Sequence, residues 1–293
     1  MLDPADLALT ELTPPAAPAA PVVADTGHLA RTFGAVIGDH WCFAERAFGG
    51  YTAALGVAAA LAATDRAHVA SASVLFLEPG RPGPIRLTVV PLRVGRTAAA
   101  VRVQARQGER TVLEATLWLA DAWGSSAPAT DASRPAIGPE GADDLDWLIE
   151  VWTMLAFGER RAIDYPTGFA SFARGRPHAE LWVRADLAAA AAPALPPHPQ
   201  VVDILHLDAH LFDAPGMITG FTSPDDPASG TSMISLDLTV AWQPGASTEP
   251  ATAWRRLTCD GSVTHGGVTS YGSLTTVDGR RLATATSQGL ARH

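Results

Sequence analysis

Residues 265–292 read HGGVTSYGSLTTVDGRRLATATSQGLAR, and residues 93–121 read RVGRTAAAVRVQARQGERTVLEATLWLAD. When the earlier stretch is displaced by 171 positions, two pairs of glycines coincide: Gly95 with Gly266, and Gly108 with Gly279. Each stretch alternates apolar and polar residues around a glycine turn, which is typical of a β-hairpin. The chain is therefore expected to build one antiparallel unit twice.

The order of the predicted elements supports the same duplication. In the first half, a helix with small residues on every face is predicted over 48–65, and strands follow over 71–80 and 85–95. In the second half, apolar spacing predicts a helix over 198–213, and a strand follows over 232–245. A helix followed by antiparallel strands, twice in sequence, indicates an α+β chain of two tandem helix-wrapped sheet units.

Composition divides the chain into four parts. Residues 1–27 are rich in Pro and Ala, and we expect an extended lead-in with order beginning near 32–38. Residues 124–140 are rich in Ser, Pro, Gly and Asp, which predicts a linker. The first unit is then expected to span 28–123, and the second unit 141–293.

The composition of the 293 residues excludes several classes of protein. A formal net charge of -9 offers no basic patch for phosphates, so nucleic-acid binding is not expected. The chain has no Lys, so it has neither a P-loop lysine nor a Schiff-base lysine. The longest apolar run, 53–63, is too short to span a bilayer, and no secretory signal is evident. A cytoplasmic protein without a membrane span is therefore expected.

The cysteines and histidines do not form metal-binding patterns. Cys42 and Cys259 lie far apart, and neither belongs to a CxxC motif or to a cluster at metal-ligand spacing. We therefore expect reduced, structural thiols, no metal and no cofactor. His265 begins a His-Gly-Gly stretch, but the chain has no G-x-S-x-G nucleophile motif, so we expect a turn there.

Three polar residues are candidates for chemistry. Asp208 lies between two apolar stripes of the second helix, where a carboxylate must be hydrogen-bonded or shifted in pKa. Ser235 opens the strand SLDLTVAW and is expected on its polar face. Gln288 takes the place of the core-facing Leu117 in the 171-residue alignment, so its amide is expected to face the core. Each also has a structural interpretation: a capping carboxylate, a solvated strand face, and an amide that ties down a loop.

The ordered set of motifs resembles the TesB-like acyl-CoA thioesterase II family, whose chains have a double hotdog fold. In that fold a long helix is wrapped by an antiparallel sheet, twice in one chain. The resemblance covers almost the whole chain beyond the first 27 residues, and its motifs are FGG at 48–50, FLEPGRPGPIRLTVVPLRVGRT at 76–97, HLDAHLF around Asp208, SLDLTVAW from Ser235 and DGRRLATATSQGLAR near the end.

The resemblance implies three catalytic positions: an Asp on the second helix, a Thr or Ser at the start of the next strand, and a Gln on the last strand. These would be Asp208, Ser235 and Gln288. The family usually has Gln-Glu-Gly at the third position, and alignment on that glycine would select Ser287 instead, so this choice stays open. Glycines at the start of the first helix would let backbone N–H groups approach a substrate closely, and these are Gly49 and Gly50.

The resemblance therefore implies an acyl-CoA thioesterase of lipid metabolism, which hydrolyses fatty or related acyl-CoA by direct attack of water. Two alternatives stay open. A hotdog-type enoyl-CoA hydratase would pair Asp208 with a helix histidine such as His210, and a non-catalytic acyl-CoA-binding protein would have a decayed site. The expected partners are acyl-CoA and, because edge strands often associate, a further copy of the chain.

Overall fold

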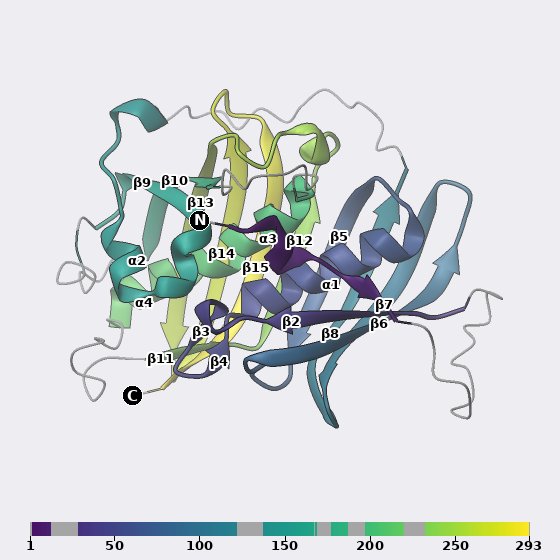
Figure 1. Ribbon diagram of the computed structural model, residues 1–293. Coiled ribbons are helices and arrows are strands. Elements are labelled where there is room, and N and C mark those ends of the chain that lie inside the picture. Colours follow the sequence, from purple (N-terminus) through teal and green to yellow (C-terminus); the bar gives the residue numbers. More distant parts are fainter. Residues whose placement is uncertain are drawn as a thin grey trace.

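One curved antiparallel sheet backs two central helices (Figure 1). In this computed structural model the described residues are 2–12, 29–121, 137–166, 168, 177–186, 197–219 and 232–292. Within them the sheet has thirteen strands, and their path runs β1-β2-β6-β7-β8-β5-β12-β15-β14-β13-β10-β9, with β11 beside β15.

The first unit wraps its sheet around helix α1 (Gly49–Thr64). The Ala and Gly residues of α1 present little bulk on any face, so strands can approach the helix closely. Asp65 ends the helix in the left-handed conformation, with a φ of 52°. The strands of this unit are β2 (Arg31–Ile37), β5 (His68–Phe76), β6 (Gly83–Val94), β7 (Ala98–Gln107) and β8 (Arg110–Ala120); a short hairpin, β3 (Cys42–Phe43) and β4 (Arg46–Ala47), precedes α1.

The second unit repeats this order around helix α3 (Pro199–His210). The prediction of one helix over 198–213 is wrong at its end, because α3 stops at His210 and a separate helix, α4 (Asp213–Thr219), follows. The strands are β9 (Gly158–Asp164), β10 (His178–Ala185), β11 (Ser232–Ser235), β12 (Asp237–Trp242), β13 (Arg255–Thr264), β14 (Gly267–Thr276) and β15 (Arg281–Arg292); helix α2 (Trp147–Val151) lies before β9.

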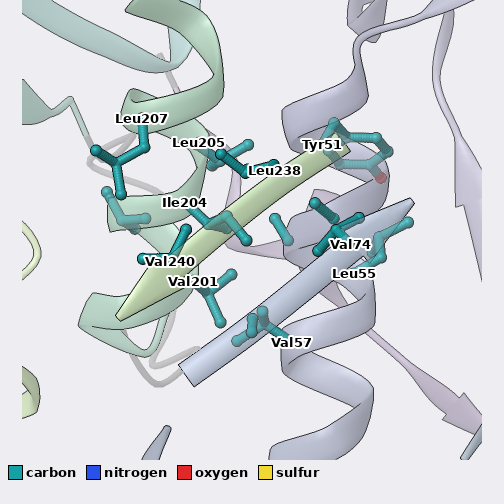
Figure 2. Close-up of a cluster of buried hydrophobic side chains, with 14 of the residues drawn as sticks. Tyr51, Leu55, Val57, Val74, Val201, Ile204, Leu205, Leu207, Leu238 and Val240 are labelled. Carbon is teal, nitrogen blue, oxygen red and sulfur yellow. The ribbon is translucent and has the colours of Figure 1, made fainter. Parts of the chain in front are cut away.

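The two units share one sheet and one core. Strand β5 of the first unit pairs with β12 of the second from Asp237↔Leu75 to Ala241↔Ser71, and the strand orders on either side of this seam mirror each other. Side chains of both helices meet over the seam strands (Figure 2): Leu55 and Val57 of α1 lie near Val74, and Val201 and Leu205 of α3 lie near Leu238 and Val240. The predicted pair of tandem helix-and-sheet units is therefore present, joined edge to edge.

The N-terminal residues are ordered, contrary to the expectation that order begins near 32–38. Residues Pro4–Leu7 form a 3₁₀ turn (η1), and strand β1 (Thr10–Glu11) pairs with β2. Leu2 is fully buried, and its N–H donates to the carbonyl of Asp186 in the second unit at 2.7 Å. The segment is held by these tertiary contacts. The Pro/Ala stretch at 13–28 and the predicted linker up to residue 136 lie outside the described residues.

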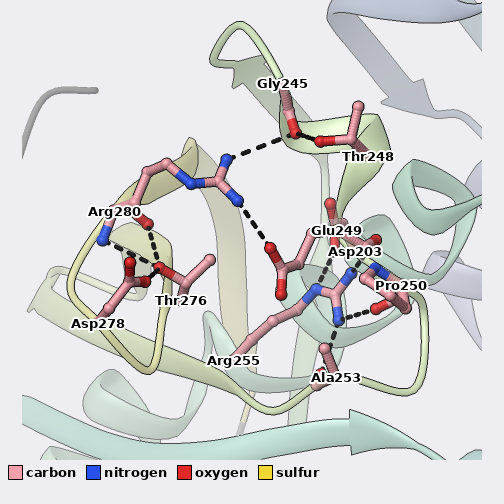
Figure 3. A network of polar contacts seen from close by, with 10 residues as sticks. All are labelled: Asp203, Gly245, Thr248, Glu249, Pro250, Ala253, Arg255, Thr276, Asp278 and Arg280. Atoms are coloured by element: carbon pink, nitrogen blue, oxygen red, sulfur yellow. Dashed lines mark hydrogen bonds and ion pairs between the residues drawn. The ribbon is translucent and has the colours of Figure 1, made fainter. Parts of the chain in front are cut away.

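A buried ion pair fixes the start of α3 to β13 (Figure 3). The Nε–H of Arg255 donates to Oδ1 of Asp203 at 2.6 Å, and both side chains are fully buried. The same guanidinium donates to the carbonyls of Pro250 and Ala253, and Trp242 donates to the other carboxylate oxygen. This network ties the loop before β13 to the helix that carries Asp208.

Candidate functional site

Asp208 lies in the last turn of α3 and faces the N-terminus of α1, so the two units meet at this residue. The N–H of Gly50 donates to its carboxylate. A Cβ added to Gly49 would lie 3.1 Å from Oδ2 of Asp208, and one added to Gly50 would lie 3.0 Å from its Cβ. The Gly-Gly pair therefore permits an approach that larger residues would obstruct.

The carboxyl group of Asp208 differs from a surface carboxylate in its burial and its pKa. Its side chain is nearly buried, and among the described residues Oδ1 has no hydrogen-bond partner. Burial raises the pKa of Asp208 to about 7, while the Gly50 N–H acts in the opposite direction. A carboxyl that titrates near neutral pH and keeps one oxygen unpaired has the properties of a general base.

Aromatic rings supply part of this low-dielectric environment. A Cβ on Gly49 would also lie 3.2 Å from the ring of Phe76, and one on Gly50 would clash with the ring of Phe48. Phe48 in turn stacks on Phe157 from the second unit, with 6.4 Å between the ring centroids. Aromatic rings from both halves therefore lie around the first turn of α1, against which Asp208 packs.

Ser235 lies on the side of the sheet that α3 covers. It pairs directly with Gly289 of β15, and directly opposed residues of an antiparallel pair share a face. A Cβ on Gly289 would lie 2.8 Å from the ring of Phe212, which directly follows Leu211 at the end of α3. The prediction that Ser235 shares the polar face of Asp237 and Thr239 is wrong, because the pairing with β15 shifts by one residue at Leu236.

Gln288 lies on the opposite side of β15, so the prediction that it faces the core is wrong. Its side chain is exposed, whereas the neighbouring Ser287 is 1% exposed and faces the helices. The Ser287 hydroxyl donates to the carbonyl of Asp237 at 2.6 Å. The alignment on the glycine, which selects Ser287, gives the residue on the helix side.

The prediction placed Gln288 on the wrong face because the turns of the two hairpins differ in length. In the first hairpin Gln107 pairs with Arg110, which leaves a two-residue turn that begins with Gly108. In the second hairpin the N–H of Thr276 donates to the carbonyl of Arg280, which leaves a three-residue loop that ends with Gly279. The two glycines are therefore not equivalent. The strand pairs next to the bulges, Ala105↔Leu113 and Leu274↔Ala283, make Ser287 the counterpart of Leu117.

Ser287 lies beneath the turn of α3 that carries Asp208. Phe212 covers Gly289, and Asp208 precedes Phe212 by about one helical turn, roughly 6 Å along the axis. Ser287 precedes Gly289 by two strand residues, roughly 7 Å. The helix and β15 run in the same sense, since Asp203 bonds Trp242, whose strand partner is Ala283. Ser287 and Asp208 therefore lie at about the same level along β15 and α3.

His210 does not accompany Asp208. Two residues apart on a helix, the two side chains diverge by about 200°. His210 is fully buried, its Nε2 accepts from Nε of Arg160 at 2.9 Å, and its Nδ1 donates to Asp213 at 2.8 Å. Tyr165 donates to the same oxygen of Asp213 at 2.7 Å. Burial lowers the pKa of His210, although Asp213 acts in the opposite direction, and the bond from Arg160 requires an unprotonated Nε2. No spacing within the helix predicts this network, because Arg160 comes from the distant strand β9.

The structure offers no resident metal site in its described part: no group of three or more His, Cys, Asp or Glu side chains there could hold an ion. Cys42 and Cys259 are both free thiols. Of the helices within the described ranges, none has the length and apolar character needed to cross a bilayer.

Residues 37–120, which contain α1 and strands β5 to β8, match the family described as the acyl-CoA thioesterase N-terminal domain. The first unit is an acyl-CoA thioesterase domain. For this part of the chain, the match bears out the predicted acyl-CoA thioesterase family and the predicted enzyme class, a thioester hydrolase. A comparison with curated proteins finds no match to the chain.

Solved structures show the double hotdog fold over almost the whole chain. A hotdog-fold protein of unknown function from Alicyclobacillus acidocaldarius has a TM-score of 0.72 at 19% identity, over 90% of this chain and 94% of that one. An acyl-CoA thioesterase II, TesB2, from Mycobacterium marinum has a TM-score of 0.68 at 19% identity, over 89% and 93%. The dehydratase domain of PpsC from Mycobacterium tuberculosis has a TM-score of 0.54 at 15% identity, over 98% and 99%. The predicted α+β double hotdog fold is therefore confirmed.

Proposed function

We propose that this thioesterase hydrolyses acyl-CoA to a free acid and CoA by direct attack of a water held by Asp208. The observation that carries the proposal is the buried carboxyl of Asp208, with a pKa of about 7 and an oxygen that has no partner among the described residues. Such an oxygen can accept a hydrogen bond from water and then take its proton.

The reaction needs one proton carrier and one place for negative charge. Asp208 takes a proton from water as the water oxygen bonds to the thioester carbon. The carbonyl oxygen becomes an oxyanion, and the N–H of Gly49 at the positive end of α1 would stabilise it, since the N–H of Gly50 is engaged by Asp208. When the C–S bond breaks, the CoA thiolate takes the proton from Asp208. No covalent enzyme intermediate and no cofactor are needed.

Ser235 and Ser287 complete the proposed site. Because the Ser287 proton is directed to the carbonyl of Asp237, its oxygen is left to accept a hydrogen bond from water. Ser235 lies on the same side of the sheet and can hold the water from a second direction. Gln288 has no part in this proposal, because its side chain lies on the other side of β15.

The hydratase alternative requires a histidine beside the acid, and the structure directs His210 to Arg160 and Asp213 instead. The orphan oxygen of Asp208 argues against a decayed binding site. Two free thiols and an acyl-CoA substrate fit a reducing compartment, so we propose that the enzyme acts in the cytoplasm. Association with a further copy of the chain stays a prediction.

The test is release of free thiol from a panel of acyl-CoAs of different chain length, followed with a thiol reagent. We expect turnover with at least one member of the panel. Absence of thiol release from every acyl-CoA would contradict the proposal. Loss of the enoyl chromophore from an enoyl-CoA without thiol release would establish hydratase activity instead.

Substitution of two neighbouring residues on β15 separates the two candidates for the third position. Ser287→Ala is expected to lower kcat/KM for thiol release by about tenfold, the effect of losing one hydrogen bond of about 1.4 kcal/mol in the transition state. The matched variant Gln288→Ala is expected to change it by less than about twofold, because that side chain is exposed. The reverse order of effects would restore Gln288 as the catalytic residue.

A further inference from the structure

A groove of about 690 Å³ runs along the edge of the first unit, away from Asp208. One wall is the N-terminal segment, with Ala8 and Leu12, and the floor comes from outward residues of β2, β6 and β7. Two glycines keep the floor open. A Cβ on Gly34 would meet only the side chain of Leu12, at 3.3 Å, and one on Gly108 would meet nothing within 4 Å.

One end of the groove holds two arginines side by side. Arg86 of β6 and Arg106 of β7 are directly opposed in the sheet, so their side chains share the outer face. Like charges in this arrangement are unfavourable unless an anion lies between them. Arg106 donates to the Glu109 carboxylate at 3.3 Å, but that side chain is fully exposed to solvent. Arg86 is exposed and has no ion pair with any residue of the described ranges.

The groove is apolar beyond the arginines. Val36, which is 66% exposed, lies two residues from Gly34 on β2, and Pro84 pairs with it from β6. At the far end, near Gly38, Asp6 is paired with His40 at 3.1 Å. Four strand residues separate Gly34 from Gly38, about 13 Å. The site therefore has cations at one end, apolar walls between, and a carboxylate at the other end, which sets the direction of any bound anion.

We propose that this groove binds a single acyl chain with a free carboxylate. The carboxylate lies between Arg86 and Arg106, and the chain lies along Val36 toward Asp6. The volume falls within the range of small-molecule sites, about 300–1,000 Å³. The choice of a carboxylate among anionic head groups rests on the proposed function, whose product is a free acid. The groove is a site separate from the catalytic one.

The groove also adjoins helix α1. The hydroxyl of Tyr51, in the first turn of α1, donates to the carbonyl of Asp6 at 2.6 Å and lies 3.2 Å from the carbonyl of Val36. The wall of the groove is therefore bonded to the same turn that holds Gly49 and Gly50.

Calorimetric titration of the full chain with sodium dodecanoate, below its micellar concentration, tests the proposal. We expect saturable binding that weakens at least tenfold in Arg86→Gln/Arg106→Gln and weakens with added salt. The matched control is Arg102→Gln, an exposed arginine on the same face of β7, which is expected to change the affinity less than twofold. Gly34→Val keeps both charges but fills the floor, and it is expected to weaken binding as strongly as the double variant.

A dodecanoate with a photoreactive diazirine in its tail locates the site. Crosslinks to residues 5–12 or 34–38 support the groove, and crosslinks confined to α1 and α3 would overturn it. Equal affinity in all the variants would also overturn it. Arginine-dependent sedimentation with anionic phospholipid vesicles, without dodecanoate binding, would assign the face to a membrane instead.

The two proposals can fail separately. Asp208→Asn is expected to keep groove binding of dodecanoate, because its side chain does not line the groove. If the wild type binds dodecanoate in the groove but releases no thiol, the groove proposal is supported and the thioesterase mechanism is contradicted. Thiol release without arginine-dependent binding of dodecanoate would do the opposite.

Discussion

Asp208→Asn is expected to lower kcat for thiol release from acyl-CoA by about 10²–10⁴-fold, the range for loss of a general base. Asn has the shape of Asp and can accept the Gly50 N–H bond, but it cannot take a proton from water. Wild-type activity is expected to rise with pH through about 7, where burial places the pKa of Asp208. A pH–rate profile of wild type and a single-pH rate of the variant measure both effects.

The same substitution is expected to stabilise the fold above pH 7. In the unfolded chain the carboxyl of Asp208 ionises near pH 3.9, whereas in the native state burial raises its pKa to about 7. Between these values the native state binds more protons, so stability falls as the pH rises. Asn removes this penalty, and a gain of about 4 kcal/mol is expected at pH 8, because the two pKa values differ by about three units, with little gain at pH 4.

Urea unfolding at the two pH values tests this prediction, with the exposed Asp39→Asn as a control that should show no such gain. Activity within tenfold of wild type would contradict the catalytic role of Asp208. Equal or lower stability of Asp208→Asn at pH 8 would show that the carboxylate is compensated by contacts in the fold.

Arg255→Met is expected to destabilise the protein by about 3–5 kcal/mol, because it leaves the buried carboxylate of Asp203 without its cation. Burial already raises the pKa of Asp203, although Arg255 acts to lower it. The carbonyls of Pro250 and Ala253 would lose their donors in the same step. The midpoint of urea unfolding measures the loss.

Two controls separate this ion pair from ordinary surface charge. Arg110→Met removes the exposed pair with Glu78 and is expected to change stability by less than about 1 kcal/mol. The double variant Asp203→Leu/Arg255→Met removes both buried charges and is expected to recover most of the loss. A double variant no more stable than Arg255→Met would show that the carbonyl contacts, rather than the ion pair, hold the loop.

Most of the fold could be predicted from local patterns in the sequence. The spacing of small residues predicted α1 almost to the residue, and the glycines predicted both hairpins, because these features depend on neighbours in sequence. Asp208 was also found locally, as a carboxylate within an apolar helix. The matching motifs in the two halves of the chain predicted that the two units are related.

The errors arose where distant contacts or single residues decide. The face of Gln288 depended on one extra residue in a turn and on a bulge at Leu282, and each step of one residue reverses a strand face. Residues 2–12 are ordered because the side chains of Leu2 and Leu7 are buried in the fold. The direction of His210 depended on Arg160, which no spacing within the helix reveals.

The contact between Gly50 and Asp208 limits how far the two copies can diverge. The acid belongs to the second copy, but the N–H that it binds and the space that it occupies belong to the first. Any side chain at Gly50 would crowd the side chain of Asp208, which lies more than 150 residues away in sequence. Both copies are therefore needed to build the proposed site, because the Asp208 carboxyl of one packs against the N-terminus of α1 in the other.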